Sequence, residues 1–166
     1  MKRLPLVLAT AAIAAGLAAA PVQAREPGPT IVGAAIAVNA QTGEFDHLID
    51  AVVATGLAGA LDGNRQFTVF APTDAAFEDL FDALGVDGVS DIPVGTLKGV
   101  LLHHVAPGER FSGDVVGSTR VRLLDRSFAY PSVRGGNAYI DDARIVAADV
   151  DVANGVIHVI DAVLLP

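Results

Sequence analysis

The chain has 166 residues, a formal net charge of −8 at pH 7 and no cysteine. An acidic chain lacks the positive surface that nucleic acid or an anionic membrane requires, so we expect no nucleic-acid partner. The absence of cysteine excludes disulfide stabilisation, and it also excludes a lipid anchor on an N-terminal cysteine. Packing alone must therefore stabilise the fold.

Residues 1–24 predict a secretory signal peptide. Lys2 and Arg3 form a basic start, Leu4–Ala20 is apolar and rich in alanine, and Val22–Ala24 forms a small-residue cleavage site. An uncleaved membrane anchor is the alternative, but the apolar run is short and flanked by proline. Removing this segment, with two basic and no acidic residues, changes the formal net charge from −8 to −10. We expect export to the periplasm or the outside, without membrane insertion once mature.

One domain is expected over residues 30–166, after a flexible, proline-rich leader at residues 25–29. Before residue 105, apolar residues recur at three- and four-residue steps, which predicts helices. Thr30 is suited to cap the first of them, and residues 39–43 are expected to form a turn. The predicted helices are Ile31–Val38, Phe45–Gly56 with a further turn to Leu61, the segment carrying Phe77 to Leu84, and Val94–His103.

His47 lies on the polar face of the second predicted helix. We expect a solvated surface side chain there, because no second ligand follows at i+4 to complete a metal site. The adjacent His103 and His104 cannot face one ion from a regular helix, so no metal site is expected at that position either.

After residue 105 the pattern changes to short strands. We expect them at Arg120–Leu124, Ser127–Val133, Asn137–Asp141, Arg144–Val152 and Val156–Leu165. Asn154-Gly155 predicts a type I′ turn between the last two strands. The last strand is almost wholly apolar, which is typical of the centre of a sheet covered on both faces. Arginines at 120, 122 and 126 predict a solvated, basic strand face.

Two segments resemble the signature segments of the fasciclin domain family. The first is Thr-Val-Phe-Ala-Pro-Thr-Asp-Ala-Ala-Phe at residues 68–77, and the second is Asn-Gly-Val-Ile-His-Val-Ile-Asp at residues 154–161. Between them, Leu-Leu-His-His-Val at residues 101–105 is similar to a further family segment. The resemblance implies an α+β fold: two packed β-sheets, forming a sandwich-like wedge, with helices on one side.

The family-motif positions are expected to be structural or partner-binding: Thr73, Asp74, His103, His104, Asn154, Gly155, His158 and Asp161. Thr73 or Asp74 is suited to cap a helix. We expect His104 to be buried and hydrogen-bonded to Asp74 or to a backbone carbonyl, because an unpaired buried ring is costly. In animal members a Tyr-His pair at this point is linked to receptor binding; here His103 stands in place of the tyrosine. His158 and Asp161 are three residues apart on a strand, so they face opposite ways and form no dyad.

The sequence contains no Gly-x-Ser-x-Gly elbow, cysteine nucleophile, Gly-rich phosphate loop or His-Glu-x-x-His motif. We therefore expect no enzymatic activity, no cofactor and no metal. The resemblance implies a secreted, non-catalytic binding module for cell adhesion or for matrix, biofilm or host contact. Its partner would be a protein, a glycan or a second copy of the chain. The alternative is a carrier of an apolar small molecule such as a carotenoid, because some fasciclin-like proteins resemble such carriers and the mature chain stays apolar.

Overall fold

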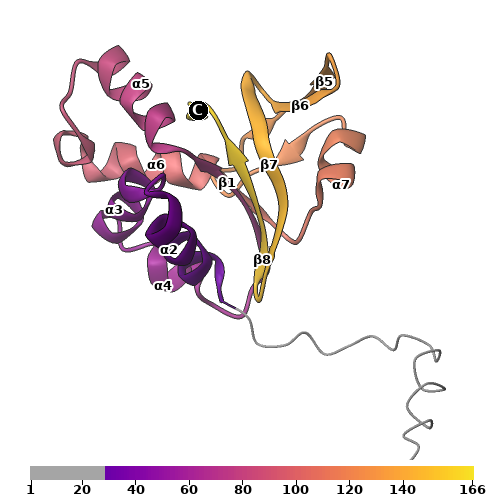
Figure 1. The fold of residues 1–166 in the computed structure, drawn as a ribbon, viewed down its shortest axis with the longest axis horizontal. Coiled ribbons are helices and arrows are strands. Elements are labelled where there is room, and N and C mark those ends of the chain that lie inside the picture. Colours follow the sequence, from indigo (N-terminus) through magenta and orange to yellow (C-terminus); the bar gives the residue numbers. More distant parts are fainter. Residues whose placement is uncertain (1–28) are drawn as a thin grey trace, which may run out of the picture.

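The computed structural model describes residues 29–166. The predicted signal peptide, and all but the last residue of the flexible leader, lie outside the described residues. Helices dominate the first half, where they gather on one side of the molecule (Figure 1). They are α2 (Ile31–Thr42), α3 (Asp46–Ala54), α4 (Ala58–Leu61), α5 (Asp74–Leu84), the 3-10 turn Val89–Asp91 and α6 (Val94–His103), and a short α7 (Ser112–Gly117) follows on the other side.

Eight strands in the described part of the chain form a six-stranded sheet and a two-stranded ribbon. The six-stranded sheet has the order β2-β1-β8-β7-β6-β5, and the ribbon pairs β3 with β4. Neighbouring strands are antiparallel except β1 and β8, which are parallel. The strands are β1 (Phe67–Pro72), β2 (Val105–Pro107), β3 (Val121–Arg122), β4 (Phe128–Ala129), β5 (Pro131–Arg134), β6 (Asn137–Ile140), β7 (Ala143–Val152) and β8 (Gly155–Ile160).

The six-stranded sheet separates two hydrophobic cores. The helical-side core lies between the sheet and helices α2 to α6, and its members include Leu48, Val69, Phe77, Leu97 and Ile157. The ribbon-side core lies beneath the ribbon and α7, and it contains Phe70, Val115, Val121, Leu123 and Ile160. The α+β fold is confirmed, and the second sheet is reduced to the two-stranded ribbon.

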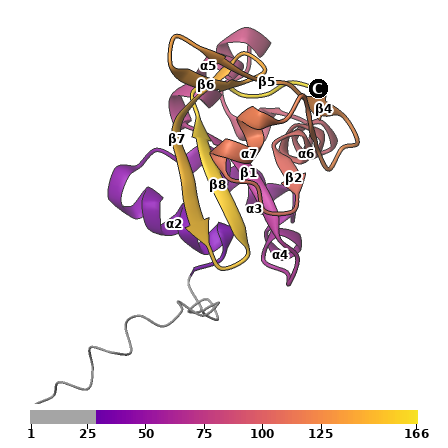
Figure 2. The same cartoon turned by 90° about the vertical axis from the view of Figure 1, so that its right-hand side faces the viewer.

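Strand β8 lies at the centre of the sheet, as its apolar sequence predicts. It is flanked by β1 and β7 (Figure 2), and its residues alternate between the two cores because successive side chains point to opposite faces. Ile157 enters the helical-side core, whereas Ile160 enters the ribbon-side core. The strand ends at Ile160, five residues earlier than predicted, because Pro72 ends the paired strand β1.

Two other boundaries differ from the predictions. Helix α2 continues to Thr42, where Gly43 ends it in the left-handed conformation at φ 66°, so the predicted turn at 39–43 is mostly helix. The predicted strand Ser127–Val133 is broken at Tyr130 into β4 and β5. The Asp141 carboxylate accepts the Tyr130 N–H at this break and redirects the chain between the two sheets.

The predicted type I′ turn at Asn154-Gly155 is wrong. Val152 pairs with Gly155, so Ala153 and Asn154 form the turn, and neither has a positive φ. The turn in which both central residues have positive φ is Gly135-Gly136, at 58° and 82°, between β5 and β6. Asn154 departs from the expected turn because its side chain is used for contacts inside the fold.

Candidate functional site

Asn154 joins three parts of the fold through one buried side chain. Its Oδ1 accepts the Ile31 N–H at 2.8 Å, at the start of α2, and its Nδ2 donates to the Leu61 carbonyl at the end of α4. Its backbone carbonyl accepts the Phe67 N–H at the start of β1. The side chain thus satisfies helix-end groups that would otherwise be buried without partners.

Gly155 is set against the backbone of β1. A Cβ atom at this position would lie 1.8 Å from the Phe67 carbonyl oxygen, and φ is 155°. Only glycine permits this approach of two backbones, which brings β8 into parallel register with β1.

Thr73 and Asp74 cap two different helices. The Thr73 hydroxyl accepts the Ala76 N–H in the first turn of α5. The Asp74 carboxylate instead accepts the N–H groups of Asp46, at 3.2 Å, and His47, at 2.9 Å, at the start of α3. Asp74 therefore links the first turn of its own helix to that of α3, where a carboxylate also complements the helix dipole.

His104 is 2% exposed and bonds to backbone at both ring nitrogens. Nε2 accepts the Leu164 N–H at 2.8 Å, so Nδ1 carries the proton and donates to the Val100 carbonyl at 2.7 Å. Asp74 is not its partner. Burial is the main reason that the pKa of His104 is lowered to about 4. The hydrogen bond to Val100 favours the charged ring and opposes this shift, whereas the neighbouring His103 lowers the pKa further. The neutral ring joins α6 to the C-terminal segment.

His103, at the position of the family's tyrosine, is buried in a three-residue cluster. Its Nδ1 lies 2.7 Å from Asp125 Oδ2 and 2.8 Å from the Ser127 hydroxyl, and Ser127 also donates to Asp125 Oδ1. Although Asp125 is desolvated, the Ser127 and His103 hydrogen bonds prevail and lower its carboxyl pKa. The cluster attaches α6 to the turn between β3 and β4. Sequence inspection missed Asp125 and Ser127; the only local signal is the Asp-x-Ser turn.

This cluster does not have the geometry of a Ser-His-Asp catalytic triad. In a triad the serine and the aspartate contact opposite ring nitrogens, so that the imidazole can take a proton from one side while the other side is held. Here both contact Nδ1 of His103. The arrangement suits a fixed hydrogen-bonded connection, and His103 at 4% exposure offers little surface to a partner.

His158 and Asp161 lie apart and serve different contacts. His158 Nδ1 accepts the Asp149 N–H at 3.2 Å, and Nε2 donates to the Arg110 carbonyl at 2.9 Å. Burial lowers the pKa of His158, against the opposing effects of the Arg110 bond and the Asp149 charge. Asp161 bonds to Arg144 through its side chain and its backbone, continuing the β7–β8 ladder beyond Ile160.

His47 is not the solvated side chain that the sequence predicts. Its ring packs edge-on against Phe81, with centroids 5.1 Å apart, and also approaches Phe77. The helical period places His47 beside the polar residues of α3, but α5 crosses close to that face. Across residues 29–166, no group of three or more His, Asp or Glu side chains is arranged to hold a metal ion.

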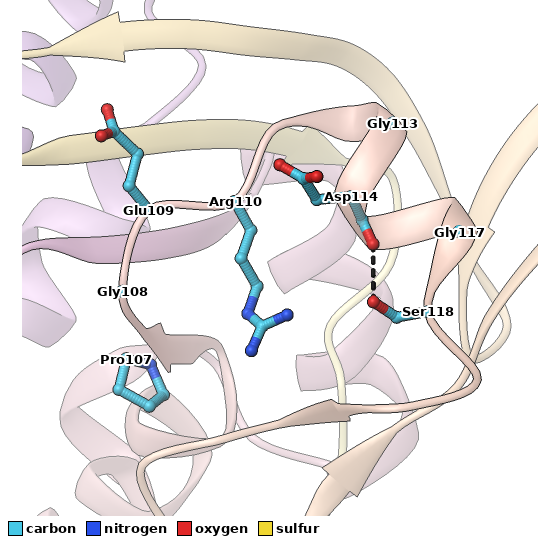
Figure 3. A pocket seen from close by; sticks show the side chains of 8 residues that line it. All are labelled: Pro107, Gly108, Glu109, Arg110, Gly113, Asp114, Gly117 and Ser118. Carbon is cyan, nitrogen blue, oxygen red and sulfur yellow. Dashed lines mark hydrogen bonds between the residues drawn. The ribbon is translucent and has the colours of Figure 1, made fainter.

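A polar pocket of about 440 Å³ opens between the loop after β2 and helix α7. The Arg110 side chain extends into it, between Pro107 and the helix (Figure 3). The Nε atom of Arg110 is buried and has no hydrogen-bond partner among the described residues. Glu109 and Asp114 line the same pocket. Their two carboxylates offset the one guanidinium, so the pocket has no net positive charge with which to select an anion.

The outer side of the β3–β4 ribbon forms the arginine face, which consists of Arg120, Arg122, Phe128 and Tyr130. All four side chains are exposed, while Val121 and Ala129 between them point into the ribbon-side core. The Arg120 guanidinium lies over the Phe128 ring at 4.3 Å from its centroid. The sequence predicts the exposed arginines; the aromatic side chains beside them emerge only from the strand pairing Arg122–Phe128.

Two apolar clefts flank helix α2, whose residues 31–38 include no polar side chain. The smaller, of about 60 Å³, lies between α2 and α3 and includes Val32 and Ile49. The larger, of about 360 Å³, lies between α2 and strands β7 and β8, and includes Val38, Ala147 and Val159. In the part of the chain that the structure describes, no helix is long and apolar enough to cross a membrane.

The profile of the Fasciclin domain family matches residues 43–166. Protein sll1483 of a Synechocystis species is 35% identical over 134 residues, which are 74% of this chain and 67% of that protein. The uncharacterized protein sll1735 of the same organism is 34% identical over 122 residues, covering 73% of this chain and 89% of that protein.

The fold also matches a solved structure, that of a FAS1 domain pair from the insect cell adhesion molecule Fasciclin I. The TM-score is 0.68 at 21% identity, and the match covers 84% of this chain and 52% of that one. Together with the profile match, these similarities show that the chain belongs to the fasciclin domain family.

Proposed function

We propose that this chain is an exported, non-catalytic binding module of the adhesion type, which binds a protein or glycan at a cell surface or in a matrix. The arginine face is the observation that carries the proposal. Arginine and aromatic side chains are enriched at protein interfaces, where they supply charge-assisted hydrogen bonds and large contact area. On an acidic protein, an exposed arginine–aromatic face has no evident folding role.

The arrangement of the signature residues supports the same proposal. Thr73, Asp74, His104 and Asn154 make hydrogen bonds inside the fold, with helix ends or backbone groups as partners. Residues used in this way define the scaffold and leave partner selection to the exposed surface. The proposed export depends on the sequence of residues 1–24.

Binding to intact cells tests this function. Residues 25–166 carrying a fluorophore would be titrated onto cells of the source organism and onto their extracted matrix, at concentrations where the chain is monomeric. Arg120→Ala combined with Arg122→Ala should raise the half-saturating concentration at least tenfold. The matched control, Arg65→Ala with Arg134→Ala, removes the same charge elsewhere and should bind like the parent. Failure of the parent to bind either material, or equal binding by both variants, would refute the proposal.

A carrier of an apolar small molecule is the second candidate, and the 360 Å³ cleft beside α2 is the observation that favours it. Pockets of this size lined by apolar side chains bind small ligands in other proteins. Absorption spectra and mass analysis of protein isolated without denaturation would reveal a near-stoichiometric apolar molecule. Ala147→Trp, which fills the cleft, should abolish its retention, whereas Ala148→Trp, outside the cleft, should not. Ligand-free parent protein would eliminate this candidate.

A further inference from the structure

We propose that the arginine face of one copy docks onto the acidic face of helix α5 of a second copy, so that molecules associate head to tail. The acidic face of α5 consists of Glu78, Asp79 and Asp82. This inference rests on the proposed function, because it names a partner for the same arginine face. Both halves of the contact lie on this chain.

The arginine face is preorganised, and neither of its arginines is paired with a carboxylate of the described residues. Arg120 directly precedes β3 and Arg122 ends it; both are exposed on either side of the buried Val121, with Cα atoms about 7 Å apart. Arg120 is held over the Phe128 ring. Neither arginine forms an ion pair with any residue from 29 to 166; the pairs present involve His103 with Asp125 and Arg134 with Asp142. An unpaired guanidinium retains its full capacity for bidentate carboxylate binding.

The acidic face of α5 is equally unpaired. Phe77, Leu80 and Phe81 point into the helical-side core, which leaves the three carboxylates exposed on the outer side of the helix. None of the three has an ion pair with another described residue. Glu78 and Asp82 are four residues apart, so they are neighbours on the helix surface.

The two faces match in spacing. Glu78 and Asp82 are separated by about 6 Å along the helix axis, at about 1.5 Å per residue, close to the spacing of about 7 Å between Arg120 and Arg122. Two arginine–carboxylate pairs can therefore form together.

Acidic residues are concentrated in the first half of the described chain. Residues 30–104 contain ten Asp or Glu and two Lys or Arg, whereas residues 105–166 contain eight Asp or Glu and six Arg. Helix α5 packs in the helical-side core, and the ribbon packs in the core on the other side of the sheet. One molecule therefore cannot close the contact on itself. Contacts between two arginine faces, or between two acidic faces, bring like charges together and are therefore disfavoured.

A contact between two different faces is heterologous and can continue from copy to copy into an open chain. A module with one domain would thereby acquire several binding faces, and multivalency raises the strength of adhesion without any new contact. Head-to-tail association thus multiplies the binding faces that one fasciclin domain presents.

Charge reversal in solution tests the contact. Sedimentation velocity of residues 25–166 over a range of concentrations should show association at an ionic strength of about 0.1 M, weakened at least tenfold at about 1 M, where the Debye length falls to about 3 Å. Arg120→Glu with Arg122→Glu should abolish it, as should Glu78→Arg with Asp82→Arg. A mixture of the two variants should associate again, because each supplies the charge that the other lost.

Arg65→Glu with Arg134→Glu is the matched control, because it changes the net charge by the same amount away from both faces. This control should associate with an affinity within about threefold of the parent, whereas the Arg120 and Arg122 variant should not associate. Unfolding curves establish that every variant is folded.

A monomeric parent at all concentrations, or failure of the mixture to associate, would overturn the head-to-tail contact. If the parent is monomeric yet binds cells through the arginine face, only this inference fails. If the parent associates but does not bind cells, only the proposed function fails.

Discussion

At the scale of single residues, two signature positions make contacts that depend closely on the residue type. Gly155 is the clearest case, because the Phe67 carbonyl occupies the place of a side chain. His104 is another, since it needs one ring nitrogen to accept from Leu164 and the other to donate to Val100. Both residues support the central pair of strands or its connection to the C-terminal segment.

Gly155→Ala should lower the free energy of unfolding by about 3 kcal/mol or more, because the added methyl group meets backbone that cannot rotate away. Gly117→Ala is the control: the corresponding space is open and its φ is not positive. That variant should stay within about 1 kcal/mol of the parent. Chemical denaturation measures both. Equal stabilities of the two variants would contradict the close approach of β8 to β1.

The neutral His104 ring should make stability depend on pH. Its pKa is about 4 in the folded protein, against 6.5 for an unperturbed histidine, so the unfolded chain takes up the proton first as the pH falls. The contribution of the neutral His104 ring to the free energy of unfolding is therefore fully present above pH 6.5. It declines as the pH falls toward 4, by about 3 kcal/mol in total. His104→Gln, which cannot titrate, should remove this part of the decline.

Denaturation of the parent and His104→Gln between pH 7 and pH 4 provides the measurement. His158, whose pKa is also lowered, contributes to the decline in both proteins and cancels in the difference, whereas the carboxylates of Asp125 and Asp149, whose pKa values lie below the usual 3.8, lose their stabilising effect only below this pH range. Parallel curves for the two proteins would show that the His104 proton is not linked to folding.

At the scale of elements, the fold depends on side chains of one element that form hydrogen bonds with the backbone at the end of another. Asp74 is in α5 but caps α3, and its own N–H donates to the Glu44 carbonyl just before α3. Asn154, in the β7–β8 turn, bonds to the start of α2 and the end of α4. These contacts set the positions of the helices on the sheet.

Asp74→Ala should lower the free energy of unfolding by about 1–2 kcal/mol, the usual effect of losing a helix cap. The loss should be local, so the amides of Asp46 and His47 should exchange with deuterium faster than in the parent. Asp50→Ala, which removes an exposed carboxylate from α3 without removing a cap, is the control. Unchanged exchange at these two amides in Asp74→Ala would exclude the capping role.

At the scale of the whole molecule, one sheet supports two cores. Strands β1 and β8 contribute side chains to both cores. Loss of packing in one core would therefore destabilise the strands that form the other core. The sheet therefore couples the helical side, which carries the excess of carboxylates, to the ribbon side, which carries the arginine face.

Both cores should unfold in one transition. Tyr130 directly follows β4 and Tyr139 lies in β6, next to Ala129 and Ile140 of the ribbon-side core, so tyrosine fluorescence reports that region, while far-ultraviolet circular dichroism reports the helices. The two signals should give the same midpoint, as two-state unfolding requires. Leu123→Ala in the ribbon-side core should lower both midpoints together, by a loss of about 2–5 kcal/mol. A tyrosine transition that precedes the helical one would show that the cores are independent.

Features that depend on neighbouring residues could be predicted from the sequence. The caps at Thr30 and Thr73, most helices and the central place of β8 follow from local propensity and from apolar periodicity. The fold class follows from the signature segments. Among surface features, the exposed arginines of the ribbon follow from strict alternation along one strand.

Only the tertiary structure decided which distant groups meet. Asn154 bonds to a residue 123 positions away, Asp74 to a helix 27 positions earlier, and His103 to Asp125 across 22 positions. The sequence prediction for His47 was wrong for the same reason, because α5 covers its helix face. A polar side chain has the same local pattern whether it meets water or a buried backbone group, and three-dimensional packing alone determines which partner it finds.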